Sequence, residues 1–256
     1  MERRLRQIET RVLPRGWGDV VRQLSLFVGA YLLYQLVRGL IDGNDVAKAT
    51  WNAYKVISLE QALHVFVEPG IQTWASHRKW LMDIADSSYL NAHYVVTIGG
   101  LVWIYLRRND SFYFVRNMFM VAMAFALVGY ALYPTAPPRL MPEWGFTDSI
   151  QQFTGITVEH GPTSALLNLY AAIPSMHVCF SLMVGWPMAR LVKHRLAAVA
   201  WALYPLFITF VVIATGNHYL TDAFLGAITA LASAVLSKEL LARARPDVWA
   251  FGQAAA

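Results

Sequence analysis

The sequence predicts an all-α membrane protein, a polytopic bundle of about six transmembrane helices with short interfacial helices. The chain is 57% hydrophobic and only 14% charged, whereas about a quarter of the residues of a soluble domain are charged. Its mean hydropathy is +0.41. Long apolar runs recur along the chain, and about 20 apolar residues suffice to cross a bilayer. We find neither the residue alternation of a β-barrel nor an internal repeat.

Six apolar runs account for the predicted spans, at about 20–41, 88–106, 112–133, 175–191, 196–214 and 219–236. The segment 42–86 is mixed, and the stretch 58–75 within it has helical apolar spacing but is too short for a span. We expect interfacial or re-entrant helices there, interrupted at Pro69 and Gly70. The whole chain, 1–256, is predicted to be one membrane domain with a Pro- and Gly-rich loop at 134–174.

The distribution of basic residues predicts the orientation, because cytoplasmic segments are enriched in Lys and Arg. With the N-terminus inside, 15 of the 21 basic residues fall on the cytoplasmic side. The segments 1–19 and 237–256 are then cytoplasmic, and the loop 134–174 lies on the non-cytoplasmic face of the cell membrane. No small-residue cleavage site precedes the first apolar run, so we expect this multi-pass protein to keep its first span.

Charge and cysteine content exclude other classes. The net charge of +5 is gathered in short segments between apolar runs, a topological pattern, so we predict no nucleic-acid partner. Cys179 is the single cysteine, which excludes an internal disulfide and a thiolate metal cage. We predict neither a metal nor a cofactor, and the oligomeric state stays open.

Four ionisable residues from three distant segments are predicted to meet at the outer membrane face: Arg139, His177, His218 and Asp222. Ionisable groups near a bilayer core are costly and are functional by default. His218 and Asp222 are four residues apart, so on a helix they share one face. The carboxylate can then orient the imidazole as a nucleophile, while His177 exchanges protons with an oxygen and Arg139 neutralises phosphoryl oxygens. Backbone N–H groups beside Ser175 can add donors.

Each residue alone has a simpler explanation. A histidine in a membrane helix often serves packing, a spacing of four residues also suits a salt bridge or half of a metal site, and Arg139 could anchor the interface. Their coincidence at one face favours catalysis. A non-enzymatic transporter or scaffold would instead continue its polar groups through the membrane midplane, where few are found. A vanadate haloperoxidase shares the HxxxD pattern but is disfavoured by the membrane spans.

The motif PSMH, followed 41 residues after its histidine by the histidine of GNHYLTDAFLG, resembles the type 2 phosphatidic acid phosphatase superfamily. YPTAPPRL, YLNAHY and the HYxxD form of the last motif are most similar to the branch of fungal inositol phosphorylceramide synthase and its bacterial relatives. The resemblance covers about 59–226. It implies His218 as nucleophile, Asp222 as its orienting acid, His177 as second catalytic histidine, and a metal-independent reaction through a phosphohistidine.

The expected substrate is a lipid phosphate or phospholipid headgroup ester, with water or a lipid alcohol as acceptor. An isoprenoid diphosphate is the alternative substrate. Phosphatases of this superfamily often carry an Arg six residues before the nucleophile, where this chain has Val212, so the phosphate site is less cationic. The residues predicted to bind the phosphate are Arg139, Ser175, Asn217, Tyr219 and His93.

Overall fold

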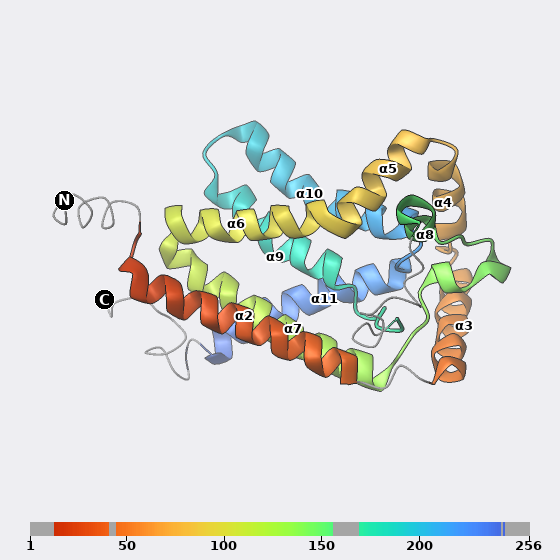
Figure 1. The fold of residues 1–256 in the computed structure, drawn as a ribbon, viewed down its shortest axis with the longest axis horizontal. Coiled ribbons are helices and arrows are strands. Elements are labelled where there is room, and N and C mark those ends of the chain that lie inside the picture. Colours follow the sequence, from red (N-terminus) through yellow and green to blue (C-terminus); the bar gives the residue numbers. More distant parts are fainter. Residues whose placement is uncertain (1–12, 41–44, 156–168, 242, 244–256) are drawn as a thin grey trace.

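In the computed structural model, which describes residues 13–40, 45–155, 169–241 and 243, the chain is an all-α helical bundle (Figure 1). Most of the predicted terminal segments and the loop portion 156–168 lie outside the described residues. The principal helices are α2 (Gly16–Leu40), α3 (Val46–Ala62), α4 (Glu68–Ser76), α5 (Lys79–Ser87), α6 (His93–Arg107), α7 (Asn109–Leu132), α8 (Ser149–Thr154), α9 (Met176–Leu191), α10 (Arg195–Ala214) and α11 (Leu220–Val235).

Within the described residues, five helices are long and apolar enough to cross a membrane: Gly16–Leu40, Lys79–Arg107, Asn109–Leu132, Arg195–Ala214 and Leu220–Leu241. The second of these joins α5 and α6 through a π-helical turn, η1 (Ser88–Ala92), and the last joins α11 to η6 (Leu236–Leu241). They correspond to five of the six predicted spans. The sixth, α9, has 16 residues, fewer than the ~20 that a span normally needs, so its crossing stays a prediction.

Helix α9 is the centre of the bundle and contacts α6, α7, α10 and α11. Its inward side chains, including Cys179 and Met183, are fully buried. Cys179 is therefore the small packing residue that its apolar setting predicts. At Gly185, an added Cβ would lie 2.8 Å from the carbonyl oxygen of Trp201, so the absence of a side chain lets α9 and α10 approach closely.

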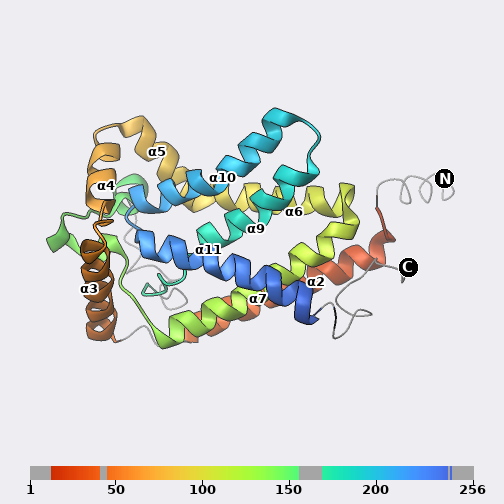
Figure 2. The same cartoon turned by 180° about the vertical axis from the view of Figure 1, so that it is seen from behind.

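The predicted interfacial segment forms α3, α4 and α5, and α3 and α4 lie across one end of the bundle (Figures 1 and 2). The expected interruption at Pro69 and Gly70 is wrong. Both residues belong to the first turn of α4, and the chain turns before it, at 63–67. The physical reason is that proline is well tolerated in the first helical turn, where its missing N–H has no partner to lose.

A polar cluster joins α2 to the bundle at the opposite end. The Asp19 carboxylate accepts hydrogen bonds from the hydroxyls of Tyr105 and Tyr113, at 2.8 and 3.0 Å. Nearby, buried Arg116 donates to Gln23 Oε1 at 2.7 Å. Because polar groups in hydrocarbon must find partners within the protein, this cluster fixes α2 against α6 and α7.

Candidate active site

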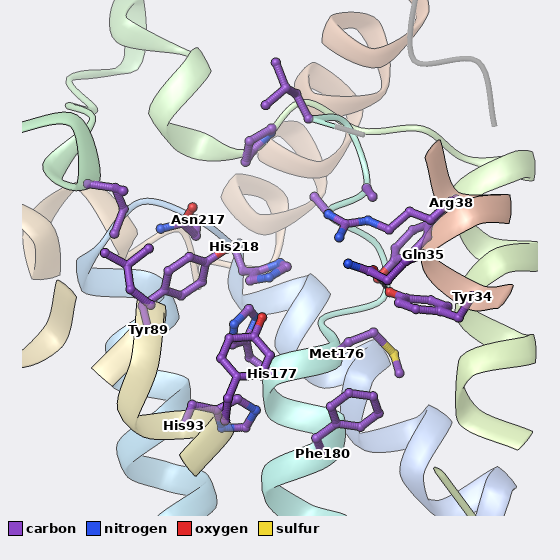
Figure 3. Close-up of a pocket in the computed structure, with 18 of the residues that line it drawn as sticks. Tyr34, Gln35, Arg38, Tyr89, His93, Met176, His177, Phe180, Asn217 and His218 are labelled. Carbon is purple, nitrogen blue, oxygen red and sulfur yellow. Dashed lines mark hydrogen bonds between the residues drawn. The ribbon is translucent and has the colours of Figure 1, made fainter. Parts of the chain in front are cut away.

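A cavity of about 320 Å³ lies at the end of the bundle that carries α3, α4 and α8. The ends of α2 and α7, the beginnings of α6 and α9, and the segment between α10 and α11 contribute to its wall. Figure 3 shows the side chains that meet there. The polar lining includes Gln35, Arg38, Tyr89, His93, Arg139, His177, Asn217 and His218.

His218 and Asp222 meet where the chain enters α11. The imidazole Nδ1 of His218 lies 3.3 Å from Asp222 Oδ2, and the same oxygen accepts the backbone N–H of Tyr219 at 3.0 Å. Asp222 is fully buried, so its carboxylate is held behind the histidine and does not line the cavity. An acceptor at Nδ1 fixes the proton on that nitrogen and leaves Nε2 as the nitrogen available to a substrate.

His177 faces His218 across the cavity, with their ring centroids 6.0 Å apart. Tyr89 stacks on the His177 ring at 4.3 Å, and His93 and Tyr94 pack around it at 5.0 and 5.8 Å. His93 is held in turn by a 2.9 Å hydrogen bond between its Nδ1 and the Tyr204 hydroxyl. The two motif histidines thus point into one cavity, with an aromatic wall that limits the rotation of His177.

Arg139 and Asn217 are joined at the rim of the cavity. An Nη of Arg139 donates to Asn217 Oδ1 at 2.5 Å, and its Nε lies 3.6 Å from Asp148 Oδ2. The Asn217 amide donates to the Thr215 hydroxyl at 2.9 Å. These contacts hold the guanidinium in the wall of the cavity that His218 also lines, and a guanidinium can bind an anionic oxygen with its planar set of donors.

Two residues predicted to bind phosphate are not brought into the cavity. Ser175 and Tyr219 are both fully buried, and neither lines it. The Ser175 backbone N–H donates to the Asp222 carbonyl at 3.0 Å, joining α9 to α11. Tyr219 packs against Phe146 in an apolar cluster under α3. Neither side chain reaches the cavity in this structure, and their part in phosphate binding stays a prediction.

A family model described as the PAP2 superfamily matches residues 54–236, a range that contains the whole site except its α2 residues. The chain belongs to the PAP2 superfamily. This confirms the superfamily that the sequence motifs indicate, and PAP2 proteins are generally phosphatases or phosphotransferases. Together with the five apolar helices, it identifies an integral membrane protein of phosphatase type. No curated protein and no solved structure matches the chain significantly.

The α2 side of the PAP2 cavity was missed by sequence reasoning. Arg38 and Gln35 extend from α2 toward the cavity opposite His218 (Figure 3). Arg38 lies near the outer end of the first predicted span, 20–41, at the membrane depth predicted for the motif residues, and this depth is the signal that points to it. It lies outside the range that the PAP2 model matches.

The beginning of α11 is held by two buried glutamates from the interfacial segment. Glu68 Oε1 accepts the backbone N–H of Leu220, and Glu60 Oε1 accepts that of Thr221, both at 2.7 Å. Burial and the neighbouring Glu68 raise the pKa of Glu60 to about 8. Asp222 likewise accepts the backbone N–H of Tyr219. Three carboxyl groups therefore accept three consecutive N–H groups that the start of a helix leaves unpaired. This arrangement fixes the segment that carries His218.

Close helix approach sets the distance between the two PAP2 motifs. A Cβ at Gly226 on α11 would collide with the backbone carbonyl of Ser175. A Cβ at Gly129 on α7 would lie 2.8 Å from Pro174 Cδ. The PSMH segment is thus packed between two helices whose contact residues must be small, and its histidine is placed by that packing.

The histidines and acidic groups that the structure describes are not grouped as metal ligands. Among residues 13–40, 45–155, 169–241 and 243, no group of three or more His, Cys, Asp or Glu side chains is placed to hold an ion. The chemistry that the described side chains can supply is nucleophilic attack, proton exchange and anion binding.

Proposed function

We propose that this protein is a lipid phosphatase or phosphotransferase whose phosphoryl group passes through a phosphohistidine on His218. The observation that carries the proposal is the placement of His177 and His218 across one cavity, 6.0 Å between ring centroids, with Asp222 behind His218. An oriented nucleophile facing a second imidazole is the minimum that two-step phosphoryl transfer requires. The substrate is a lipid phosphate or a phospholipid headgroup ester.

In the first step, His218 Nε2 attacks phosphorus, and the bond from phosphorus to the lipid oxygen breaks. His177 gives a proton to that departing oxygen, so the lipid alcohol leaves neutral. Asp222 stabilises the positive charge that develops on the His218 ring. Arg139, and Arg38 from the opposite wall, neutralise the phosphoryl oxygens.

In the second step, water or another lipid alcohol attacks the phosphohistidine, and His177 takes its proton. With a lipid phosphate as substrate, water yields inorganic phosphate; with a headgroup ester, water yields the phosphorylated headgroup. A lipid alcohol as acceptor yields a new phosphorylated lipid in either case. The likeness of YPTAPPRL and the HYxxD motif to inositol phosphorylceramide synthase favours the transfer outcome. Val212, where phosphatases of the superfamily often have Arg, is fully buried in an apolar cluster, which supports a site with fewer cationic groups.

The test is product analysis on the purified full-length protein in detergent with excess EDTA. The substrates are phosphatidic acid, phosphatidylinositol and an isoprenoid diphosphate, each with and without ceramide as acceptor. In wild type we expect inorganic phosphate from a lipid phosphate, inositol phosphate from phosphatidylinositol, or a phosphorylated acceptor. In His218→Ala we expect a loss of roughly a thousandfold or more, the scale of other nucleophile deletions.

The matched control is His194→Ala, an exposed histidine at the start of α10, at the other end of the bundle. It should retain wild-type activity. Retention of more than about a tenth of the activity in His218→Ala would place the nucleophile elsewhere. Loss of activity in EDTA with rescue by one metal would overturn the metal-independent mechanism, and no turnover on any substrate would favour the transporter or scaffold alternative.

A further inference from the structure

An apolar groove of about 550 Å³ runs between α2 and α6 and joins the cavity that holds the two motif histidines. Aliphatic and aromatic side chains line it almost throughout. It shares three wall residues with the cavity: Tyr31, Tyr94 and Phe180. The groove therefore borders the site through these three side chains and extends into the hydrophobic part of the bundle.

The junction lies next to the chemistry. Tyr94 packs edge-on against His177, with ring centroids 5.8 Å apart, and Phe180 follows His177 by three residues on the same face of α9. A hydrocarbon chain attached to an oxygen beside His177 reaches the groove by passing Tyr94. The side chains of Tyr31, Tyr94 and Phe180 form the boundary between the two spaces.

One face of α2 changes from cationic to apolar along this path. Arg38, Gln35 and Tyr31 line the cavity, and Val28 and Leu24 line the groove below them. Steps of three or four residues place them on one helical stripe. The polarity of the stripe matches an amphiphile with its phosphate at Arg38 and its chain directed toward Leu24.

The groove passes the polar cluster that joins α2 to the bundle, because Leu13, Leu106 and Phe112 also line it. Tyr105 lines the groove and donates to Asp19. From Tyr94 to Tyr105 along α6 the rise is about 16 Å. One leaflet, half of the ~30 Å hydrocarbon core, is about 15 Å thick, so the groove is long enough for a hydrocarbon chain that spans one leaflet.

We infer that the α2–α6 groove binds a hydrocarbon chain of the lipid substrate, so the protein selects long-chain lipid phosphates that reach the site from within the bilayer. The inference rests on the proposed function, because it names the substrate class of the same site. Leu24 and Ile98, each 58% exposed, border the groove on its lipid side. A chain can therefore enter laterally while its phosphate stays at the membrane surface.

Binding can be tested without turnover. The probe is phosphatidic acid with a diazirine at the end of one acyl chain, photolysed with full-length His218→Ala protein in phosphatidylcholine nanodiscs. We expect labelled peptides from 20–28 of α2 and 97–106 of α6, and competition by excess unlabelled phosphatidic acid but not by extra phosphatidylcholine. Labelling on other helices, no labelling, or equal competition by both lipids would overturn the inference, the last because bulk lipid then fills the groove.

Chain selection gives a second readout. The measurement is kcat/KM for dipalmitoyl and for dioctanoyl phosphatidic acid in mixed micelles. Ile98→Trp should lower the ratio of the long-chain value to the short-chain value about tenfold, because the indole displaces roughly two methylenes of the chain from the groove. Val95→Trp is the matched control: Val95 is 69% exposed on the same helix and does not line the groove. An unchanged ratio in Ile98→Trp, or the same fall in Val95→Trp, contradicts the inference.

The two proposals fail differently. If wild type turns over neither lipid, the proposed function fails, while the photolabelling still decides whether the groove holds a chain. If wild type turns over both dipalmitoyl and dioctanoyl phosphatidic acid, but neither the photolabelling nor the kcat/KM ratio behaves as expected, the catalytic proposal stands and the groove inference is wrong.

Discussion

Tyr89 lies nearly parallel to His177, with ring centroids 4.3 Å apart and an angle of 22° between the planes. Stacked aromatic pairs contribute about 0.5–1.5 kcal/mol beyond their burial, so the stack restrains the His177 ring. His218 is restrained differently, by the Asp222 carboxylate at its Nδ1. The two histidines therefore differ in environment, and this difference predicts a difference in role.

His177→Ala should impair an alkyl phosphate ester far more than an activated aryl phosphate. Phosphatidic acid loses a poor alcohol that needs a proton, whereas nitrophenolate leaves without one. His218→Ala should impair both substrates equally, because no phosphoenzyme forms. Steady-state kinetics of each variant on both substrates measures these losses of activity. Equal losses in His177→Ala would show that His177 does not act as the proton donor.

Glu60 should make the protein less stable as the pH rises toward 8. Its pKa moves from about 4.5 to about 8 on folding, so between these values the folded state binds more protons than the unfolded state. Stability then falls with increasing pH and levels off above the folded pKa. Thermal unfolding in detergent from pH 5 to 9 measures this. Glu60→Gln should flatten the profile, while the exposed Glu143→Gln should keep the wild-type slope.

Gly226→Ala should destabilise the protein and lower its activity. The new Cβ collides with the Ser175 carbonyl, and overpacking of this kind costs about 1–3 kcal/mol. The displacement would also move His177, two residues after Ser175. Gly99→Ala on α6 is the control, because nothing lies within 4 Å of its Cβ and alanine favours a helix by up to about 1 kcal/mol. Equal thermal stability of the two variants would contradict the close approach.

The cavity should face the non-cytoplasmic side. In a Cys179→Ala background, a cysteine substituted for Glu143, at the cavity end of the bundle, should react with an impermeant thiol reagent added to intact cells. A cysteine substituted for Asn109, at the junction of α6 and α7, should react only after the membrane is permeabilised. The distribution of Lys and Arg is the physical reason. The reverse labelling pattern would place the site in the cytoplasm.

Local spacing was sufficient to predict the helices and the motif residues. The apolar runs predict four of the spans to within about five residues, because a helix that faces lipid must be apolar over its length. The span Lys79–Arg107 begins nine residues before its predicted start at 88. The four-residue spacing of His218 and Asp222 places both on one face of a helical turn, whatever surrounds it. Their proximity to His177 followed from a shared membrane depth, which confines distant segments to one plane.

The contacts between helices are shown only by the tertiary structure. Glu60 and Glu68 lie in a segment that the sequence describes only as mixed, and their role depends on α3 and α4 crossing the end of the bundle. Arg38 and the α2–α6 groove depend on how closely α2 packs against α6 and α7. Hydropathy gives the depth of a side chain but not the direction in which its helix faces a neighbour. That direction is set by packing and polar contacts between segments far apart in the chain, which no local pattern contains.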